Sequence, residues 1–403
     1  MTDHRLGADF WRLWSAAVVS RLGGGVASAG LPLLAASLTR DPRQVALVSV
    51  FAGLPWLLLA LHTGALADRW DRRRTMWLCD LASAAVFAGL AVGVLAGAAS
   101  LWLLCAAAFA AASISTLFDS ANQAALPSLV GRDQLSTANS RLYTGTVVAG
   151  LLVGPPLGSW LFVAQPAVPF AVDAASFVGS AALVFAIRTR FRAAARSGTG
   201  LTREIGDGVR WLWRHRRLRA LVVLLTVWNL TETAVIGVLV LYALERLQVA
   251  PSAYGLLLTG LAVGGVLGAA VAPRLERWWG TGPLVVVTVV LTVLAEVGLA
   301  LTRSAVVAGA LLGVVGLAAF AFNVVSVSYR QSVVPDELQG RVSSAYRFAT
   351  WGIAPVGAAL GGVVAAGAGL AAVFWGAAAV LAVAGLATAR ELVPARVATD
   401  VPS

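Results

Sequence analysis

The chain of 403 residues is too apolar for a soluble protein of this length. Apolar residues make up 59% of it, charged residues 12%, and the mean hydropathy is +0.83, whereas a soluble domain carries about 25% charged residues. Intrinsic disorder is excluded as well, because it needs low hydrophobicity and high charge. The composition therefore indicates an all-α protein that crosses a membrane several times.

Twelve apolar stretches of helix length follow in chain order. Each approaches the roughly 20 residues that cross a bilayer core as a helix, and they lack the alternation of membrane β-strands. Segment 188–218 is the one long polar break, and it separates six stretches from six. We therefore predict two six-helix bundles, at 1–187 and 219–403, joined by a cytoplasmic linker at 188–218. The stretches cover residues 13–38, 44–66, 76–97, 100–122, 139–163, 167–187, 219–244, 252–272, 283–301, 304–328, 342–364 and 369–389.

The distribution of arginine sets the expected orientation. The formal net charge is +11, and all 30 basic residues are arginine. If the N-terminus is cytoplasmic, 25 of the 30 fall on that side, four fall in the loops opposite and Arg21 is left within a span. This is a strong positive-inside signal, so we expect a multi-pass plasma-membrane protein with both termini cytoplasmic. The positive charge is thus explained by the orientation of the chain in the membrane, and we expect no nucleic acid as a partner.

The end of the linker combines aromatic and basic residues, in the sequence WLWRHRRLR at 211–219. Such a segment suits an amphipathic helix on the inner leaflet, held by anionic membrane lipid. An unstructured connector is the alternative.

The two halves contain related segments in the same order. Residues 121–141 and 328–347 both have Gln, a short apolar run, Pro, an acidic residue, Leu and then Arg entering the next span. Gly/Pro clusters follow at 150–160 and 352–362, half a chain apart. The order of these matches favours duplication of a six-helix unit, so we expect the two bundles to be pseudo-symmetric.

Two motifs resemble those of a known transporter family. The loop GALADRWDRRR at 64–74 resembles the signature loop of the major facilitator superfamily, with Asp71 where the general pattern has glycine; the matching residues are Gly64, Leu66, Ala67, Asp68, Arg69, Arg72, Arg73 and Arg74. The fifth span resembles the antiporter signature of that family through Gly150, Gly154, Pro155 and Gly158. The stretches 10–34 and 254–269 are similar to the branch of macrolide-efflux and enterobactin-exporter proteins.

The resemblance implies a twelve-helix major facilitator fold and a secondary transporter without a cofactor. We expect a monomer that exports a small amphipathic or lipophilic compound by alternating access, with protons moving inward as the driving ion. A proton-coupled importer, a lipid translocator and a transporter-like sensor are the alternatives. Many twelve-span drug–proton antiporters have an arginine in span 4, which this chain lacks at 100–122, so we expect no relay built on that arginine.

Other classes of protein need residues that this sequence does not offer. It has no GxxxxGK[ST] motif, which argues against an ATP-driven pump within this chain. His4, His62 and His215 are scattered, and Cys79 and Cys105 lie in apolar stretches. We therefore expect no metal site, no disulfide framework and no enzyme.

The signature loop is suited to act as a gate. A carboxylate at Asp68 can lie at the positive N-terminal end of a neighbouring helix and pair with arginine, which would lock the two halves together in one state. The candidate gating residues are Gly64, Asp68, Arg69, Arg72 and Asp80, the last as a partner early in the third span. A charged loop that only sets topology is the alternative.

The glycines of the fifth span recur every four residues. Gly150, Gly154 and Gly158 therefore fall on one helix face and permit close backbone approach, and Pro155 bends the helix. We expect a tight seam between helices here. It either limits leakage through the closed transporter or is ordinary membrane packing.

Charged residues within the spans indicate the transport site, because burying them in a membrane is costly. Arg21 lies near the middle of span 1 and Glu232 near the middle of span 7, and these spans correspond under the repeat. Glu232 is the leading candidate for proton coupling, with a static Glu232–Arg21 pair as the alternative. Asp119, near the cytoplasmic end of span 4, is expected either to carry a proton or to pair with Arg132 or Arg141.

Other polar and aromatic residues are weaker candidates for the same site. Asn229 in span 7 offers a hydrogen bond to a substrate. Asp173 in span 6 and Glu296 in span 9 are expected toward the outer face, where Glu296 meets Arg303 or water and Asp173 can reach the outer vestibule. The aromatic candidates, which packing explains equally well, are Trp14, Phe51, Trp56 and Trp351.

Overall fold

The computed structural model describes residues 6–59, 71–123, 126, 129–131, 134–188 and 210–392. Within these ranges the regular structure is helical, with no strand. The main elements are α1 (Ala8–Leu38), α2 (Pro42–Leu58), α4 (Arg72–Leu95), α5 (Leu101–Gln123), α6 (Leu135–Val147), the π-helix η2 (Val148–Val153), α7 (Gly154–Ala164), α8 (Val168–Phe185), α10 (Arg216–Leu241), the π-helix η3 (Tyr242–Arg246), the 3₁₀-helix η4 (Pro251–Ala253), α11 (Tyr254–Trp279), α12 (Thr281–Leu301), α13 (Ala305–Val333), α14 (Asp336–Trp351), α15 (Ala354–Ala368) and α16 (Leu370–Leu392).

Eleven helices or continuous helical runs in the described ranges are long and apolar enough to cross a membrane. The apolar helix α2 has only 17 residues, and the end of its predicted span, at 60–66, lies outside the described residues. The prediction of an all-α polytopic membrane fold is therefore confirmed. The count of twelve spans stays a prediction.

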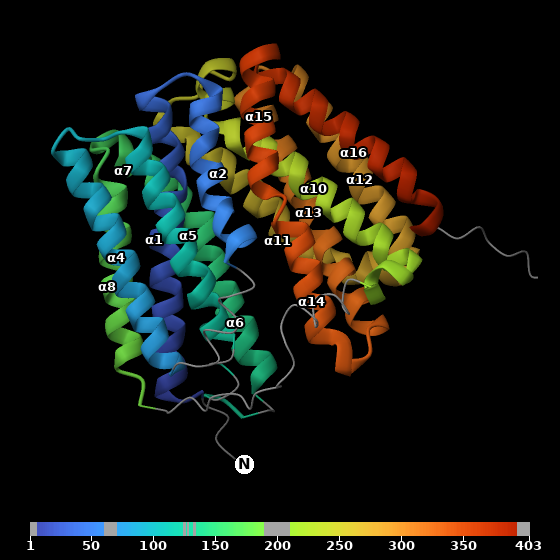
Figure 1. Ribbon diagram of the computed structural model, residues 1–403, viewed down its shortest axis with the longest axis horizontal. Coiled ribbons are helices and arrows are strands. Elements are labelled where there is room, and N and C mark those ends of the chain that lie inside the picture. The colour runs from blue at the N-terminus through green and yellow to red at the C-terminus, as the bar shows by residue number, and fades with distance from the viewer. Residues whose placement is uncertain are drawn as a thin grey trace, which may run out of the picture.

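The helices form two bundles with the same internal packing. Helices α1 to α8 make up the N-terminal bundle and α10 to α16 the C-terminal bundle, which lie side by side in Figure 1. Each helix of the first bundle has a counterpart in the second with the same packing neighbours. In the first bundle the packed pairs are α1–α8, α4–α8, α4–α5, α2–α5 and α1–α7. The corresponding pairs in the second are, in the same order, α10–α16, α12–α16, α12–α13, α11–α13 and α10–α15. A duplicated six-helix unit produces this recurrence, so the bundles have the expected pseudo-symmetry.

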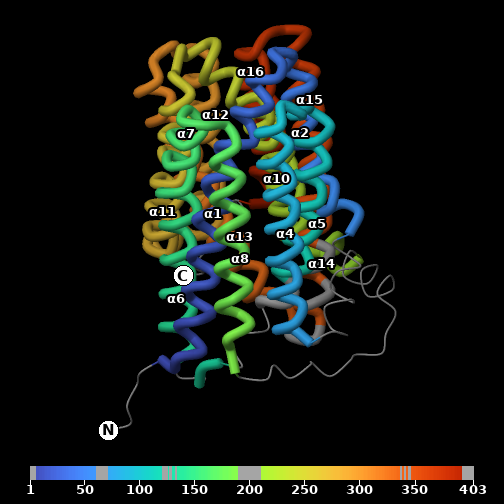
Figure 2. The backbone as a smooth tube through the Cα atoms, turned by 90° about the vertical axis from the view of Figure 1, so that its left-hand side faces the viewer, coloured from blue at the N-terminus to red at the C-terminus, as the bar shows by residue number. Residues whose placement is uncertain are grey.

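The two bundles contact each other toward one end of their helices. We call the side on which α1 begins the N-terminal face, at the bottom of Figure 1, and the other side the opposite face. Contacts between the bundles join mainly α2 to α15 and α10, and α7 to α11 and η4. The rings of Trp56 and Trp351 lie 6.1 Å apart, and Arg40 pairs with Glu245 at 3.8 Å. The bundles meet at the top of Figure 1 and diverge toward the N-terminal face, and the helices run lengthwise between the two faces in Figure 2.

Two helix reversals in the C-terminal bundle consist of a single glycine. Gly280 separates α11 from α12 with φ of 80°, and Gly369 separates α15 from α16 with φ of 87°. Residues with a Cβ rarely adopt a positive φ, whereas glycine does so readily. The glycines thus allow neighbouring helices to pack antiparallel with the shortest possible connection.

The predicted fifth and eleventh spans are each interrupted near a proline. The fifth consists of α6, η2 and α7, with Pro155 and Pro156 in the first turn of α7. The eleventh breaks at Gly352 and Ile353, directly before Pro355 in α15. Proline lacks the N–H of a helical hydrogen bond and clashes with the preceding turn, and π-turns and breaks are the usual result.

The end of the predicted linker differs from the expected single amphipathic helix. Residues 210–214 are helical, His215 interrupts them and α10 begins at Arg216. Leu212 and Leu218 are buried in the core of the C-terminal bundle, and Arg219 pairs with Glu391 at 2.8 Å. These leucines face protein, whereas Trp213 in the same short helix is 54% exposed, and contact of this segment with lipid stays a prediction. Residues 189–209 lie outside the described residues, and the domain boundaries stay predictions.

Candidate transport site

The predicted site residues Arg21 and Asp119 lie together in the N-terminal bundle. Arg21 on α1 and Asp119 on α5 form an ion pair of 3.4 Å, with 56% and 28% of their side chains exposed. The partner predicted for Asp119 was Arg132 or Arg141. Arg141 instead lies over the ring of Trp11, and Arg132 lies outside the described residues. The long Arg21 side chain reaches from mid-helix to Asp119, which residue spacing along the sequence did not reveal.

The Arg21–Asp119 pair lies at the edge of a cavity inside the N-terminal bundle. The cavity has a volume of about 330 Å³ and is lined by α1, α2, α4, α5 and α8. Its walls are mainly alanine, glycine, serine and phenylalanine, and its ionisable residues are Arg21, Cys79, Asp80, Asp119 and Asp173. Three carboxyl groups and one guanidinium therefore share one enclosed space.

Asp80 and Asp173 are the two most deeply buried carboxyl groups of this cavity, at 1% and 0% exposure. Ser180 donates a hydrogen bond of 2.7 Å to the Asp80 carboxyl group. The Ser176 hydroxyl lies 2.8 Å from the Asp173 backbone carbonyl oxygen and 3.3 Å from Asp173 Oδ1, and it shares its proton between them. Asp80, predicted as a gate partner, is thus held by α8.

Asp173 was predicted toward the outer face. It instead lies against Gly23, at the midpoint of α1. With 18 residues to the 31 of α1, α8 begins well below the opposite end of α1, which lowers Asp173 toward mid-membrane.

Glu232 lies in the other bundle, half-buried within α10. It has no hydrogen bond or ion pair among the described residues, and its charge is close enough to interact with that of Glu296 on α12. The alternative Glu232–Arg21 pair is not formed, since Arg21 pairs with Asp119. Glu296 is 5% exposed, and its Oε2 lacks a partner within the described structure. The expected contact of Glu296 with exposed Arg303 is therefore absent.

Asn229, the predicted hydrogen-bond donor to a substrate, already donates a hydrogen bond to another residue of the protein. Its Nδ2 donates to the carbonyl oxygen of Thr350 on α14 at 2.8 Å, and its residue is 8% exposed. One helical turn later, Thr233 donates to the Asn229 carbonyl oxygen. Asn229 therefore joins α10 to α14 in this state.

Part of the gating loop lies outside the described residues, including Gly64, Asp68 and Arg69. Arg72 is the first residue of α4, and Asp71 caps that helix by accepting a hydrogen bond of 2.8 Å from the Arg74 backbone N–H. Aspartate is a favoured N-cap, which explains the departure from glycine at this motif position. We did not predict this cap from the sequence, although an acidic residue directly before an arginine-rich helix start is a signal for it.

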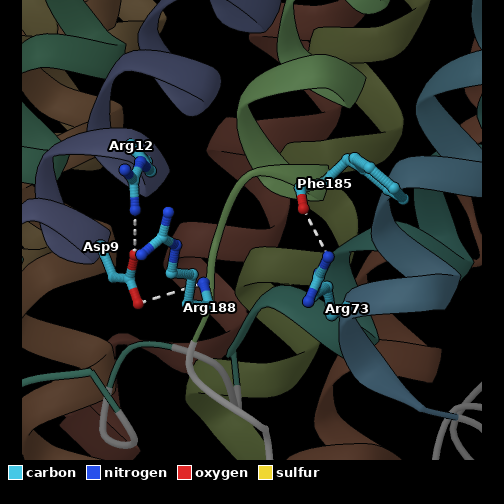
Figure 3. A network of polar contacts seen from close by, with 5 residues as sticks. All are labelled: Asp9, Arg12, Arg73, Phe185 and Arg188. Atoms are coloured by element: carbon cyan, nitrogen blue, oxygen red, sulfur yellow. Dashed lines mark hydrogen bonds and ion pairs between the residues drawn. The ribbon is translucent and has the colours of Figure 1, made fainter.

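Polar contacts join the start of α1 and the start of α4 to the end of α8 at the N-terminal face (Figure 3). Arg73 donates to the carbonyl oxygen of Phe185 at the end of α8. Asp9 pairs with Arg12 at 2.6 Å and accepts a hydrogen bond from the Arg188 backbone N–H at 3.2 Å. These contacts lie within the N-terminal bundle, so they fix its lower rim as one unit.

The glycines of the antiporter-type motif pack against α1 at backbone distance. A Cβ at Gly25 of α1 would overlap the Gly150 carbonyl oxygen, one at Gly154 would lie 2.6 Å from Gly25 Cα, and one at Gly158 would overlap the Val26 carbonyl oxygen. Close approach of this kind gives strong van der Waals packing between membrane helices. The seam predicted from the spacing thus lies between α1 and η2–α7.

The next turn of the same motif contacts the other bundle. A Cβ at Gly255 of α11 would overlap the Pro155 carbonyl group, and Gly255 N–H donates to Ser159 Oγ at 2.8 Å. Ser159 is the position at which the motif departs from glycine, and its hydroxyl is buried. Helix α7 therefore contacts α1 on one side and α11 on the other.

A second, larger cavity of about 590 Å³ lies between α1 and α6–η2. Trp11, Trp14 and Arg141 form its polar and aromatic end, and Trp14 Nε1 donates to the Arg141 carbonyl oxygen at 3.0 Å. The remaining lining is mostly aliphatic. Such a surface can hold an apolar body with one polar end.

Comparison with known proteins gives one family match over almost the whole chain. The family model described as transmembrane secretion effector, of the major facilitator superfamily, matches residues 7–403. The multidrug efflux pump Tap of Mycolicibacterium fortuitum is 28% identical over 377 residues, which cover 89% of this chain and 90% of Tap. An uncharacterised MFS-type transporter of Mycobacterium tuberculosis is 35% identical over 147 residues, so the match spans about a third, 33%, of that relative.

Solved structures have the same fold. The crystal structure of a mutant of the nucleoside transporter NupG superposes on this chain with a TM-score of 0.79. The match includes 96% of this chain and 100% of the NupG chain, at 12% sequence identity. At that identity the likeness concerns the fold alone. It agrees with the two-bundle architecture described above.

Proposed function

The chain belongs to the transmembrane secretion effector family of the major facilitator superfamily, and from that premise we propose that it exports small amphipathic or lipophilic compounds by alternating access. The match of 89% of the chain to the multidrug efflux pump Tap carries this proposal. The two bundles rock against each other about a site between them, so that the site opens to one side of the membrane at a time.

In this account the N-terminal face is cytoplasmic, because most of the arginines belong to that side. Contact between α2 and α15 and between α7 and α11 then closes the outer side. The arrangement corresponds to an inward-facing carrier, the state in which an exporter loads its substrate. Export requires these contacts to open while the bundles approach each other at the N-terminal face.

Proton movement into the cell drives export, and each proton contributes about 2.3 kcal/mol per 100 mV of membrane potential. A membrane-embedded carboxyl group has to carry the proton. Glu232 is supported in this role by its place in the interior of α10 and by its lack of a polar partner among the described residues. An unpaired acid in a membrane favours its neutral form, so binding and loss of a proton change its charge.

The signature loop and the glycine seam complete the proposed transport cycle. Asp68 and Arg69, which precede the capped start of α4 in the sequence, gate the cytoplasmic side in this account. The seam at Gly150, Gly154 and Gly158 limits leakage, because backbone contact leaves no path for ions between α1 and α7.

The residues that line the larger cavity support the proposed substrate class. The cavity at Trp11, Trp14 and Arg141 combines aromatic rings with a mainly aliphatic lining, which favours an amphipathic molecule over a strongly polar one. A cell with the gene deleted should therefore become more susceptible to lipophilic compounds.

A susceptibility panel of macrolides, tetracyclines, siderophores and lipophilic cations, on cells with and without the protein, tests this. The proposal expects lower intracellular accumulation of at least one compound when the protein is present. Higher accumulation would favour the importer, and altered leaflet composition without any compound being moved would favour a lipid translocator.

A further inference from the structure

Helix α8 has a line of buried polar side chains beginning at Asp173, which lines the cavity inside the N-terminal bundle. Asp173, Ser176 and Ser180 follow at spacings of three and four residues, so they share one helix face. Ser176 donates to Asp173, and Ser180 donates to Asp80 across on α4. Two hydroxyl groups therefore lie between two buried carboxyl groups, over about 10 Å of helix.

Asp173 is enclosed and only partly satisfied. Its residue has 0% exposure, and Oδ2 has no hydrogen-bond partner within the described structure. Oδ1 lies against Gly23 of α1, where a Cβ would overlap the Ser176 hydroxyl. The absence of a side chain at Gly23 thus makes room for this acid at mid-membrane depth.

The charges around Asp173 do not neutralise it. The ionisable groups facing the cavity are Arg21 from α1, Cys79 and Asp80 from α4 and Asp119 from α5, and α2 and α7 contribute none. Arg21 already pairs with Asp119. Asp80 and Asp173 have no cationic partner among the described residues, and a buried carboxylate without one is strongly disfavoured. A bound proton removes that charge.

Contacts lead from Asp173 to the interface between the bundles. Gly23 touches Asp173, and Gly25, two residues later on α1, touches Gly150 and Gly154. Helix α7 in turn contacts Gly255 of α11 through Pro155 and Ser159. A change in charge at Asp173 that shifts α1 is therefore transmitted through packed backbone to the bundle interface.

We propose that Asp173 binds a coupling proton inside the N-terminal bundle, with Asp80 as the second carboxyl group of the relay; this rests on the proposed function as a proton-driven exporter. A proton from outside forms an O–H bond at the Asp173 carboxylate, and in the inward-facing state that bond breaks and the proton leaves to cytoplasmic water. The proton site lies apart from the substrate site, so proton and substrate act through α1 and do not compete for the same atoms.

The test uses the full-length protein in proteoliposomes with an imposed pH gradient and ethidium, a lipophilic fluorescent cation, as the probe. One coupled proton supports about a tenfold substrate gradient per pH unit. Asp173→Asn should lose about that factor in steady-state ethidium accumulation, while exchange of ethidium without a pH gradient continues. Persistent exchange shows that the variant is folded and inserted.

Glu276→Gln is the control, because it makes the same acid-to-amide change at the end of α11, where glutamine keeps the acceptor for the Thr281 hydroxyl. It should keep the full gradient-driven accumulation. Unchanged accumulation in Asp173→Asn, or an equal loss in both variants, would overturn the assignment.

Infrared difference spectra after a pH jump give a measurement that needs no substrate. The spectrum of the purified wild-type protein should contain one carboxylic C=O band that is missing in Asp173→Asn, while the bands of the other buried acids, such as Glu232, remain. If this band is lost but the wild type moves no ethidium or panel compound, the proton site stands and the proposed export function fails. If the wild type is driven by pH and the band persists in Asp173→Asn, the export function stands and this inference fails.

Discussion

The embedded charges divide into paired and unpaired groups. Arg21 neutralises Asp119, whereas Glu232 in the C-terminal bundle and Asp173 in the N-terminal bundle have no cationic partner within the described structure. Unpaired acids at membrane depth are costly in the charged form. They are therefore the groups whose protonation changes most when a transporter alternates between two states.

Replacement of Glu232 tests its proposed role in coupling. Glu232→Gln keeps the size of the side chain and removes its charge change, so the substrate gradient driven by pH should fall by the contribution of one proton, about tenfold per pH unit, while insertion and folding persist. The measurement is pH-driven transport in proteoliposomes, with expression and monodispersity in detergent as controls. Full pH-dependent transport by this variant would remove Glu232 from the coupling mechanism.

Residue partners were the part of the site that sequence spacing predicted least well. Arg21, Glu232 and Asp119 were recognised because a charge within an apolar run stands out. The partner of Asp119 was wrong, because it depends on how α1 and α5 pack and on the reach of an arginine side chain. The mid-membrane depth of Asp173 was missed because α8 begins beside Gly30, well before the end of α1 at Leu38.

At the scale of helices, caps and close contacts fix where elements begin and how near they lie. The spacing of Gly150, Gly154 and Gly158 predicted a seam but could not name its partner, which is Gly25 and Val26 on α1. Pro155 predicted a bend in the fifth span, and the π-helix η2 interrupts that span directly before α7; the break after Trp351 in the eleventh span was not predicted. Helix α2 is described as far as Leu58, and the predicted end of its span at 60–66 lies outside the described residues, so the length of this span stays a prediction.

The cap of α4 has a measurable effect on stability. Asp71→Ala removes the side-chain acceptor for the Arg74 N–H, and loss of an N-cap typically costs about 1 kcal/mol. Thermal unfolding in detergent should therefore begin at a lower temperature. Asp71→Asn is the matched control, because asparagine caps about as well as aspartate; equal stability of the alanine and asparagine variants would contradict the cap.

Neighbouring glycines on α1 offer a second matched pair. Gly25→Ala forces a methyl group into the Gly150 carbonyl oxygen and should destabilise the protein by about 1–3 kcal/mol. Gly24→Ala meets nothing within 4 Å and should be neutral or slightly stabilising, since alanine favours helix. The melting temperatures of the two variants in detergent test this difference in stability. Equal melting temperatures would contradict the close backbone packing of α1 against η2 and α7.

The whole molecule joins these features into one transporter. Its composition and span pattern predicted the membrane fold, and its motifs predicted the superfamily, because both are repeated over the full length of the chain. The direction of transport and the substrate depend on a few cavity side chains and on the applied gradients, so neither could be read from periodicity. The conformation is likewise a property of contacts between bundles, such as α2 with α15 and α7 with α11.

The central claim, proton-driven export, is tested most directly in inside-out membrane vesicles that contain the wild-type protein. A proton gradient is imposed with the vesicle interior acidic, and uptake of ethidium and of the compounds identified by the susceptibility panel is followed by fluorescence or radiolabel. The account predicts uphill uptake into the vesicles that collapses when a protonophore removes the gradient. Uptake that is absent, or that is unaffected by the protonophore, would contradict it.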